Sequence, residues 1–362
     1  RIWDALEDEI GEDVGFRRGG CFFTANSEKQ LEEHAAWLDT AEHYGIGSRL
    51  LSADELGQHI SGSAANWAGA LYTATDGRAE PQKATPAIAR AAARSGATVL
   101  TSCAVRGIET SGGKVSAVVT EHGRIETPAV LCAAGAWTSL FCGSLGVNVP
   151  QLRVRGTVAR TAPASSVLNG NVYDDRLGIR RREDGGYSIA HGSILEHLVT
   201  PASFRHFVRF IPALKQEFRI LRLSFGREFI DEWRTPRSWS MDEPSPFEKT
   251  RVLDPQPNKR VLKAIRRHLD SLFPPLANTP IVESWAGMIE SSPDVVQIID
   301  EIDNIPGFYV ATGFSGHGFG IGPGAGKAIA GMLTREGSGI DISPFRLSRF
   351  FDGSPIRLQA SI

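Results

Sequence analysis

The chain has 362 residues, of which 41% are hydrophobic, so it can bury a large core divided over about two domains. Its formal net charge of −2 gives no overall positive field, which argues against binding of nucleic acid or an anionic membrane through global charge. The four cysteines show no metal-ligand spacing and no apolar run approaches the ~20 residues of a membrane span, so we expect no metal, no span and a reducing cytoplasm.

The N-terminal part of the chain predicts several helices and a strand pair. Residues 2–10 have the spacing of an amphipathic helix, and Pro81–Ser95 form an alanine-rich helix. Ser27 and Ser52 are good N-caps, and we expect a further helix to begin after each of them. Residues 15–25 predict a strand pair or one long strand with a glycine break.

A compact β-meander is expected next. Its predicted strands are Ala97–Leu100, Val105–Thr110, Val115–Thr120 and Arg124–Thr127, separated by glycine-containing turns. Residues 129–133 then form a fully apolar strand whose cysteine is a buried thiol. This strand ends in small residues, which let a ligand or another backbone come close.

The stretch from about residue 151 to residue 284 has a different pattern of predicted elements. Short alternating runs such as Arg153–Thr161 and Tyr187–His191 predict antiparallel strands, and Ser203–Phe218 and Lys259–Phe273 predict helices between them. We interpret this stretch as a mixed α+β domain that is inserted between two parts of a ligand-binding domain.

The strongest functional signal lies between Gly307 and Leu333. The apolar run Phe308–Ala311 predicts a buried strand, a crowd of glycines follows, and a helical pattern is expected after Pro323. A strand, a glycine-rich turn and a helix together point unpaired backbone N–H groups at an anionic or electron-rich ligand. Glycine allows such a ligand to approach the backbone closely.

Two phosphate-binding motifs can be compared with the sequence of this segment. A Walker-type phosphate loop fails, because Ile321 stands where it needs glycine and Ala328 where it needs serine or threonine. Gly320, Gly322 and Ala325 fit G-x-G-x-x-A, but no acidic residue follows at the required distance. A tightly packed corner without a ligand stays an alternative.

The order of motifs along nearly the whole chain resembles that of the flavin-dependent D-amino-acid oxidase superfamily, which includes glycine oxidase, sarcosine oxidase and D-amino-acid dehydrogenases. Each motif is only moderately specific alone, and the ordered set is what carries the resemblance. The motifs are Asp76-Gly77 before Pro81, residues 103–108 (CAVRGI), residues 130–137 (VLCAAGAW), Trp285-Ala286-Gly287, Pro293-Asp294 and residues 307–319 (GFYVATGFSGHGF).

The resemblance implies an α/β plus α+β flavoprotein of two domains. Residues 1–19, 76–151 and 286–362 would form a Rossmann-like FAD-binding domain, and residues 20–75 and 152–285 an inserted antiparallel-sheet substrate domain. The family opens with a strand and G-x-G-x-x-G, and this N-terminal βαβ unit does not occur in the sequence. We therefore expect either a fragment or a partner that supplies the unit, in a homo- or hetero-oligomer, and poor FAD binding by this chain alone.

The resemblance also implies which residues contact FAD. Val105 would contact the adenine side, and Gly135 and Trp137 the pyrophosphate side. The turn after the buried strand would hold the flavin ring with its backbone N–H groups facing the electron-rich edge. The residues of this turn are Gly313, Phe314, Ser315, Gly316, His317, Gly318 and Phe319.

The substrate site departs from the family pattern. Relatives that oxidise amino acids use two arginines for the substrate carboxylate, and the matching positions here are Ile289 and Gly316. We expect Arg180 or His191 to contact the polar end of the substrate, or a larger amine without a free carboxylate. No side chain is assigned a catalytic role beyond the flavin.

The predicted reaction is oxidation of the C–N bond of an amino acid or secondary amine by hydride transfer to flavin N5, which gives an imine. The sequence leaves the electron acceptor open. Two alternatives are a partner-dependent subunit of a heteromeric amine or opine dehydrogenase and a non-catalytic fragment. A third is an FAD-binding module that modifies a tRNA base, which the lack of a basic excess disfavours.

Overall fold

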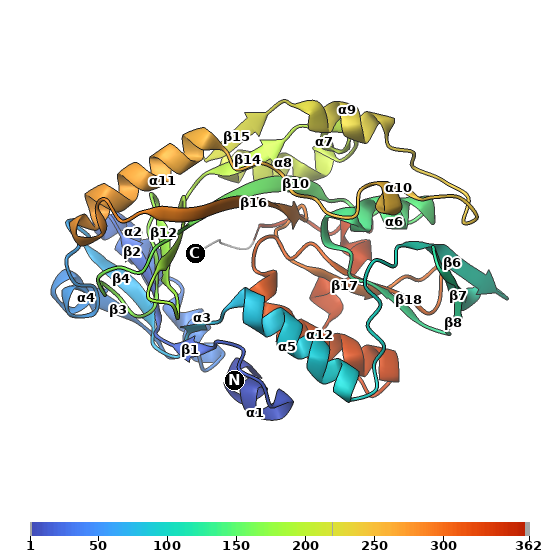
Figure 1. The fold of residues 1–362 in the computed structure, drawn as a ribbon, viewed down its shortest axis with the longest axis horizontal. Helices are drawn as coiled ribbons and strands as arrows, with labels where there is room; N and C mark the ends of the chain where they lie inside the picture. The colour runs from blue at the N-terminus through green and yellow to red at the C-terminus, as the bar shows by residue number, and fades with distance from the viewer. Residues whose placement is uncertain (1, 219, 359–362) are drawn as a thin grey trace.

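A computed structural model describes residues 2–218 and 220–358. It shows a ten-stranded sheet on one side of the molecule and a smaller layer of sheets and helices on the other (Figure 1). The large sheet has the order β15-β14-β10-β13-β12-β11-β2-β4-β3, with β16 paired along β10. Its strands are β2 (Cys21–Ala25), β3 (Ser48–Ser52), β4 (Gly69–Thr73), β10 (Leu152–Thr161), β11 (Asn171–Tyr173), β12 (Gly178–Arg181), β13 (Tyr187–Ala190), β14 (Leu195–Leu198), β15 (Leu221–Ser224) and β16 (Ile281–Ser291).

The large sheet is mixed, which corrects the expectation of an antiparallel sheet. β2 runs parallel to β11, and β14 runs parallel to β15, whereas the other neighbours are antiparallel. A parallel pair needs a connection of about a dozen residues or more. Both parallel pairs have connections of that length, and the alternating pattern of a single strand does not reveal its direction.

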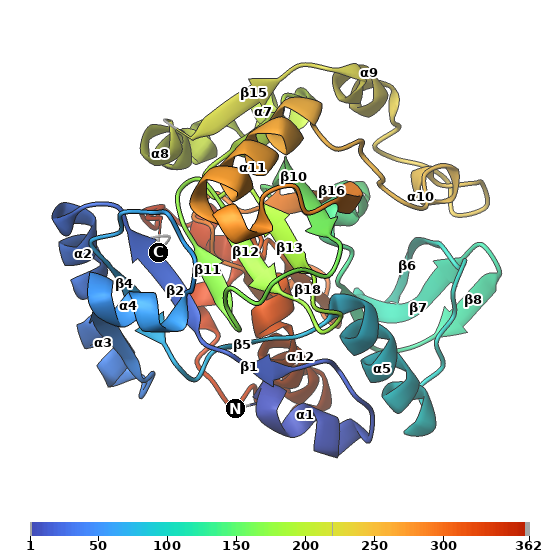
Figure 2. The same ribbon diagram turned by 60° about the vertical axis from the view of Figure 1, so that its left-hand side comes forward.

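Helix α11 (Lys259–Leu272) covers one face of the large sheet (Figure 2). The side chain of Asn258 caps it by accepting hydrogen bonds from the N–H groups of Arg260 and Val261. Val261, Ile265, Leu269 and Leu272 are buried against the sheet, so the predicted stripe is confirmed. Each fully buried aliphatic side chain of this kind stabilises the fold by about 1.5–3 kcal/mol.

The opposite layer contains the strand and the glycine-rich segment with the strongest sequence signal. β18 (Phe308–Thr312) is buried over its whole length, as predicted, and lies between β17 (Ile298–Glu301) and β9 (Val130–Cys132). Helices α1 (Ile2–Ile10), α5 (Pro81–Arg94) and α12 (Gly318–Thr334) belong to this layer (Figure 1).

The meander has three strands rather than the expected four. These are β6 (Val105–Ser111), β7 (Lys114–Thr120) and β8 (Gly123–Glu126). Residues 97–100 form no strand, and the side chains of Val99 and Leu100 are 54% and 57% exposed. A strand requires a hydrogen-bonded neighbour, and none lies beside these residues in the described part of the chain.

The remaining elements complete the described part of the chain. The predicted caps are confirmed, because the side chains of Ser27 and Ser52 accept hydrogen bonds from the first turns of α2 and α4. Among the residues that the structure describes, no helix combines the length and apolarity needed to cross a membrane. The elements are α2 (Glu28–Ala35), α3 (Leu38–His43), α4 (Ala53–His59), β1 (Arg17–Arg18), β5 (Gly77–Arg78), η1 (Gly135–Trp137), α6 (Thr138–Ser144), α7 (Pro201–Arg205), α8 (Phe207–Glu217), α9 (Arg227–Arg234), α10 (Pro246–Lys249), η2 (Pro274–Leu276), η3 (Ser343–Phe345) and η4 (Leu347–Phe350).

Candidate functional site

The glycine-rich turn joins the end of β18 to the start of α12. Gly313, Ser315 and Gly316 have φ values of +70°, +51° and +90°, so the backbone reverses through left-handed conformations that glycine adopts at little cost. The helix begins at Gly318 rather than after Pro323, which corrects the predicted start. Pro323 is the sixth residue of this helix, where its ring nitrogen donates no hydrogen bond.

The N-terminus of α12 has the properties of a site for an electron-rich group. The first-turn N–H groups of a helix have no acceptor within the helix, and its dipole makes this end positive. A Cβ added to Gly320 or Gly322 would meet no atom within 4 Å, so the space beside the first turns is open. Trp3 lies at one side, donating its indole N–H to the carbonyl of Gly320 at 2.7 Å.

Gln151 fastens the small residues after β9 to the end of β18. Its side chain is only 4% exposed, and its Nε2 donates to the carbonyl of Gly135 at 2.9 Å and to Oγ1 of Thr312 at 3.0 Å. Its Oε1 accepts the N–H of Ser139 at 3.1 Å. A buried amide with three partners fixes η1 beside the turn. The sequence analysis missed Gln151, which directly precedes the alternating strand β10 and has no local signal of this role.

A buried ion pair stabilises the loop that contacts the glycine-rich turn. Nε of Arg349 donates to Oδ2 of Asp294 at 2.7 Å, and the two side chains are only 8% and 10% exposed. Oγ of Ser292 donates to Oδ1 of Asp294 at 3.2 Å, and the N–H of Ser292 donates to Oγ of Ser315 at 3.4 Å. Asp294 belongs to a motif that the sequence analysis found, whereas its partner, Arg349, was not foreseen.

Ile289 and Gly316, the two positions that the resemblance matches to substrate-binding arginines, lie next to each other. Cγ2 of Ile289 is 3.9 Å from the position that a Cβ on Gly316 would occupy. Cδ1 of the same isoleucine is 3.1 Å from the corresponding position at Gly156 on β10. Ile289 therefore fills the space between the large sheet and the turn with an apolar side chain.

Glu290 follows Ile289 on β16, and its side chain is half-buried. The backbone carbonyl of Glu290 accepts the N–H of Ser315 at 3.1 Å, which holds the strand against the turn. Burial raises the pKa of the Glu290 carboxyl, and hydrogen bonds from backbone N–H groups oppose this shift.

Arg180 faces the turn side of the large sheet and is already engaged. It pairs with Ser188 on β13, and the alternation of the strands places it on the same face as Ile289. Its guanidinium donates to the carbonyl of Ala79 at 2.7 Å and to Oε2 of Glu80 at 3.2 Å. Arg180 thus connects the large sheet to the start of α5.

His191 lies on the other face, so the structure does not bring it alongside Arg180. Its ring stands edge-on to that of His268 on α11, with centroids 5.4 Å apart. Its Nδ1 accepts the N–H of Ser193 at 3.2 Å. Burial lowers the pKa of His191, and the neighbouring His268 lowers it further, so the ring is neutral at pH 7.

The predicted cofactor residues fall into three groups. Gly313 to Phe319 lie together in the turn and the first turn of α12, with His317 exposed at the N-cap. Gly135 and Trp137 form η1, which Gln151 joins to β18. Val105 begins β6 in the separate meander and packs against the core that contains β9 and β18.

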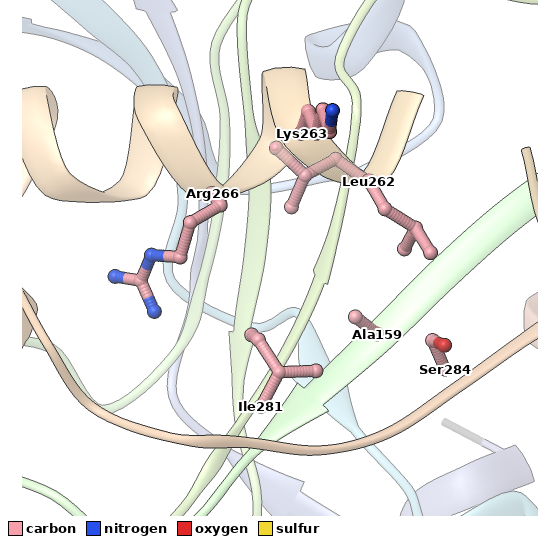
Figure 3. Close-up of a pocket in the computed structure, with 7 residues that line it drawn as sticks. Ala159, Leu262, Lys263, Arg266, Ile281 and Ser284 are labelled. Atoms are coloured by element: carbon pink, nitrogen blue, oxygen red, sulfur yellow. The ribbon is translucent and has the colours of Figure 1, made fainter. Parts of the chain in front are cut away.

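A hollow of about 360 Å³ lies away from this site, between α11 and β16 (Figure 3). Ala159, Leu262 and Ile281 give it an apolar lining. Arg266 stands at its margin, and its Nη1 donates to the carbonyl of Thr279 at 2.7 Å. The open glycine-lined space at the turn, and not this hollow, combines free backbone donors with a positive helix end.

Comparison with known proteins identifies relatives over most of the chain. A family model described as "DAO: FAD dependent oxidoreductase" matches residues 1–332. The mitochondrial sarcosine dehydrogenase of Mus musculus is 26% identical over 352 residues, which are 95% of this chain and 34% of that protein. The glycine oxidase of Pseudomonas aeruginosa is 26% identical over 242 residues, covering 67% of this chain and 51% of that protein.

Solved structures show the same architecture. The L-amino acid deaminase of Proteus myxofaciens, determined in complex with anthranilate, superposes with a TM-score of 0.92 at 32% identity. The match covers 96% of this chain and 79% of that chain. By contrast, the chain spans about a third of the length of the sarcosine dehydrogenase and of the 4-methylaminobutanoate oxidase of Paenarthrobacter nicotinovorans.

Proposed function

We propose that this chain, which belongs to the DAO family of FAD-dependent oxidoreductases, oxidises the C–N bond of an amino acid or an amine. FAD is the cofactor of the family. The observation that carries the proposal is the open N-terminus of α12, because a positive helix end with glycines beside it fits an electron-rich ring.

The residues around the turn fit FAD. A Cβ on Gly135, Gly287 or Gly320 would meet no atom within 4 Å, and these glycines belong to three elements that meet at the turn. We infer that residues 313–319 hold the flavin ring, that η1 lies beside the pyrophosphate and that Val105 contacts the adenine. When bound, FAD supplies the acceptor for the hydride that leaves the α-carbon, and the substrate becomes an imine.

In the reaction, the protein's own residues bind and orient the substrate and exclude water from it. No side chain has to remove a proton if the amine is bound in its neutral form. Ile289 excludes water from the space between the turn and β10, where its methyl groups approach Gly316 and Gly156. An apolar wall without a cation favours an amine with a large apolar part over a small amino acid.

We assign substrate binding to residues 20–75 and 152–285, and FAD binding to residues 1–19, 76–151 and 286–362. Strands β2 to β4 and β10 to β15 share one sheet, which supports this division. The boundary at residue 286 falls inside β16, so one strand belongs to both parts.

Arg180 and His191 are our two candidates for the polar end of the substrate. Arg180 shares the face of Ile289, whereas His191 lies under α11, so Arg180 is to be tested first. Its bond to Glu80 implies that it would contact the substrate with its remaining N–H groups or position α5.

The test is an FAD titration of the purified chain with and without a fused G-x-G-x-x-G unit, followed by anaerobic addition of a panel of primary, secondary and N-methyl amines and amino acids. We expect poor FAD binding by the chain alone, and in the fused protein a bound flavin whose absorbance bleaches with at least one member of the panel. Bound flavin that no amine reduces, while a chemical reductant does, would contradict the proposed activity. Arg180→Gln and His191→Gln are then compared on the best substrate. Substitution of the residue that contacts the polar end of the substrate should lower kcat/KM by tenfold or more.

A further inference from the structure

Strand β16 forms an edge of the large sheet that no other strand covers in the described part of the chain. It pairs with β10 from Ile281 to Ser291, and the sheet continues from β10 on the other side, through β13 and β14. With 11 residues, β16 is about twice as long as a usual strand. An uncovered edge of this length is a template for a further strand, because its outward N–H and C=O groups lack partners.

The outward backbone groups of β16 belong to alternate residues. The carbonyl of Glu290 points away from β10, since it accepts the N–H of Ser315 in the turn at 3.1 Å. Backbone direction alternates along a strand, so Ser284, Ala286 and Met288 share this outward direction. Within the described residues, no group outside the ladder with β10 hydrogen-bonds to the backbone of these three. None of them is charged or a proline, the residue types that often block pairing at a natural edge.

The hollow between α11 and β16 lies beside this edge (Figure 3). Ser284 lines it together with Ala159, its partner across the ladder, so both side chains are on the face that α11 covers. Directly opposite residues of neighbouring strands share a face. In an added strand, the residue paired with Ser284 would therefore place its side chain at the hollow. The volume of about 360 Å³ accommodates a branched aliphatic side chain, and Leu262 and Ile281 give it apolar contacts.

The helix beside the hollow is strongly basic. α11 carries five basic side chains and one acidic side chain, Asp270, which already pairs with Arg266. Lys263 lines the hollow, is exposed and has no acidic partner among the described residues. The acid next to Ser284 on β16, Glu283, is paired with Arg160 at 2.6 Å. An acidic residue in an added strand would therefore meet an uncompensated positive charge beside the hollow.

We propose that the edge of β16 from Ser284 to Met288 binds an extended, acidic peptide segment of a partner protein, which adds a strand to the large sheet. The segment places an apolar side chain in the hollow and carries acidic residues beside it on the same face, within reach of Lys263. In this mode of binding the main-chain hydrogen bonds supply affinity and the side-chain pocket supplies specificity. A second copy of this chain fits less well, because antiparallel pairing of two β16 edges would bring two basic α11 helices to the same face.

The first experiment measures fluorescence polarisation of a fluorescein-labelled peptide on addition of the full chain. The probe has the sequence TDTLTET, in which a leucine and two flanking acidic residues lie on one face of an extended strand. We expect saturable binding at protein concentrations below about 1 mM. The matched peptide TKTLTKT, with lysine in place of both acidic residues, should bind about tenfold more weakly or worse. No binding of TDTLTET, or equal binding of the two peptides, would overturn the proposal.

Two substitutions of one residue test the role of the edge itself. Ser284→Pro removes an outward N–H group and keeps the ladder with β10, because proline is tolerated on an edge strand where its nitrogen faces outward. Ser284→Ala is the matched control, which keeps this N–H group. We expect Ser284→Pro to weaken binding of TDTLTET by about tenfold or more, and Ser284→Ala to stay within about twofold of the wild type. Equal binding by the two variants would contradict strand addition at β16.

A charge reversal provides a test that does not depend on whether the proline variant folds. Lys263→Glu changes an exposed side chain beside the hollow, and Lys249→Glu makes the same change at an exposed position of α10. Lys263→Glu should bind TDTLTET about tenfold more weakly than Lys249→Glu. The same affinity in both variants would show that Lys263 does not face the peptide and would overturn the proposed site.

Hydrogen exchange and sedimentation identify the occupant of the edge. Exchange of the amides of Ser284, Ala286 and Met288 should slow when TDTLTET is bound, whereas that of β3, at the far edge of the same sheet, should not change. Protection of β3 instead of β16 would place the peptide elsewhere. Sedimentation velocity without peptide should show a monomer. A dimer that Ser284→Pro converts to a monomer would assign the edge to a second copy of this chain and overturn the proposal.

Discussion

In the proposed site, in which residues 313–319 hold the flavin ring, Gly316 has the most demanding backbone conformation. Its φ of +90° is strained for any side chain, and Ile289 lies beside it. We predict that Gly316→Ala destabilises the fold by about 1–2 kcal/mol and also abolishes or strongly weakens FAD binding. Denaturation and flavin content of the purified variant measure the two effects separately.

The hairpin between β6 and β7 provides a control with the same backbone strain. Gly113 has a φ of +79° and nothing within 4 Å of a would-be Cβ, but it lies in the meander far from the turn. Gly113→Ala should lose comparable stability and keep its flavin. If both variants retain flavin equally, residues 313–319 do not hold the ring.

Glu290 predicts a specific dependence of stability on pH. Because burial raises the pKa of its carboxyl in the folded state above the ordinary value of 4.5, ionisation favours the unfolded state. Its contribution is therefore most favourable below pH 4.5 and is lost as the pH rises through the folded-state pKa. Glu290→Gln should gain melting temperature relative to the wild type at pH 7 more than at pH 4. An offset that is the same at both pH values would contradict this.

Residue-level prediction from the sequence succeeded where the signal is local. Ser27 and Ser52 cap helices that begin within three residues of them, and Cys132 is buried in its own apolar strand. Gln151 and Arg349 were missed because their partners, among them Thr312 and Asp294, are far away in the sequence. No sequence pattern around Gln151 or Arg349 indicates a partner so far away.

At the scale of elements, the C-terminal turn η4 is held to the loop before β17 by the ion pair of Arg349 and Asp294. We predict that Asp294→Asn destabilises the protein by about 3–5 kcal/mol, because it leaves the arginine charge buried without compensation. Urea denaturation measures the loss. Loosening this loop should also reduce flavin content, since Ser292 connects it to the turn.

A second ion pair in the same segment serves as the control. Arg346 and Asp352 are 2.8 Å apart, but their side chains are 40% and 36% exposed, so solvent screens the pair. Asp352→Asn should change stability far less than Asp294→Asn. Similar losses in the two variants would show that burial does not set the strength of the inner pair.

Elements with a strong period were predictable, and elements that depend on a neighbour were not. The four-residue spacing of Val261, Ile265 and Leu269 predicted α11 with its buried face, its first residue and an end one residue beyond the observed one. Residues 97–100 have strand composition but no neighbouring strand. The start of α12 was placed too late because a run of glycines predicts a loop, whereas here β18 and the turn fix the backbone in a helix.

For the whole molecule, FAD binding should be measurable as added stability. A ligand that binds only the folded state stabilises it by about 2.7 kcal/mol at a free concentration of about one hundred times Kd. For the chain fused to a G-x-G-x-x-G unit, we predict a rise in melting temperature with FAD that saturates, and a much smaller rise for Gly316→Ala. Because the site joins η1, β16 and α12, the rise should appear in the main unfolding transition.

Strand β16 joins the large sheet rigidly to the glycine-rich turn. It pairs with β10 along its length and then meets the turn at the bridge between Ser291 and Phe314. A hinge at residue 286 would have to break this ladder in its middle, so the halves cannot swing apart to admit a substrate. In the proposed site, substrates would therefore enter and products leave through movements of side chains and loops around Ile289. Turnover should accordingly respond to the bulk of the substrate more than to solvent viscosity, which slows large domain motions.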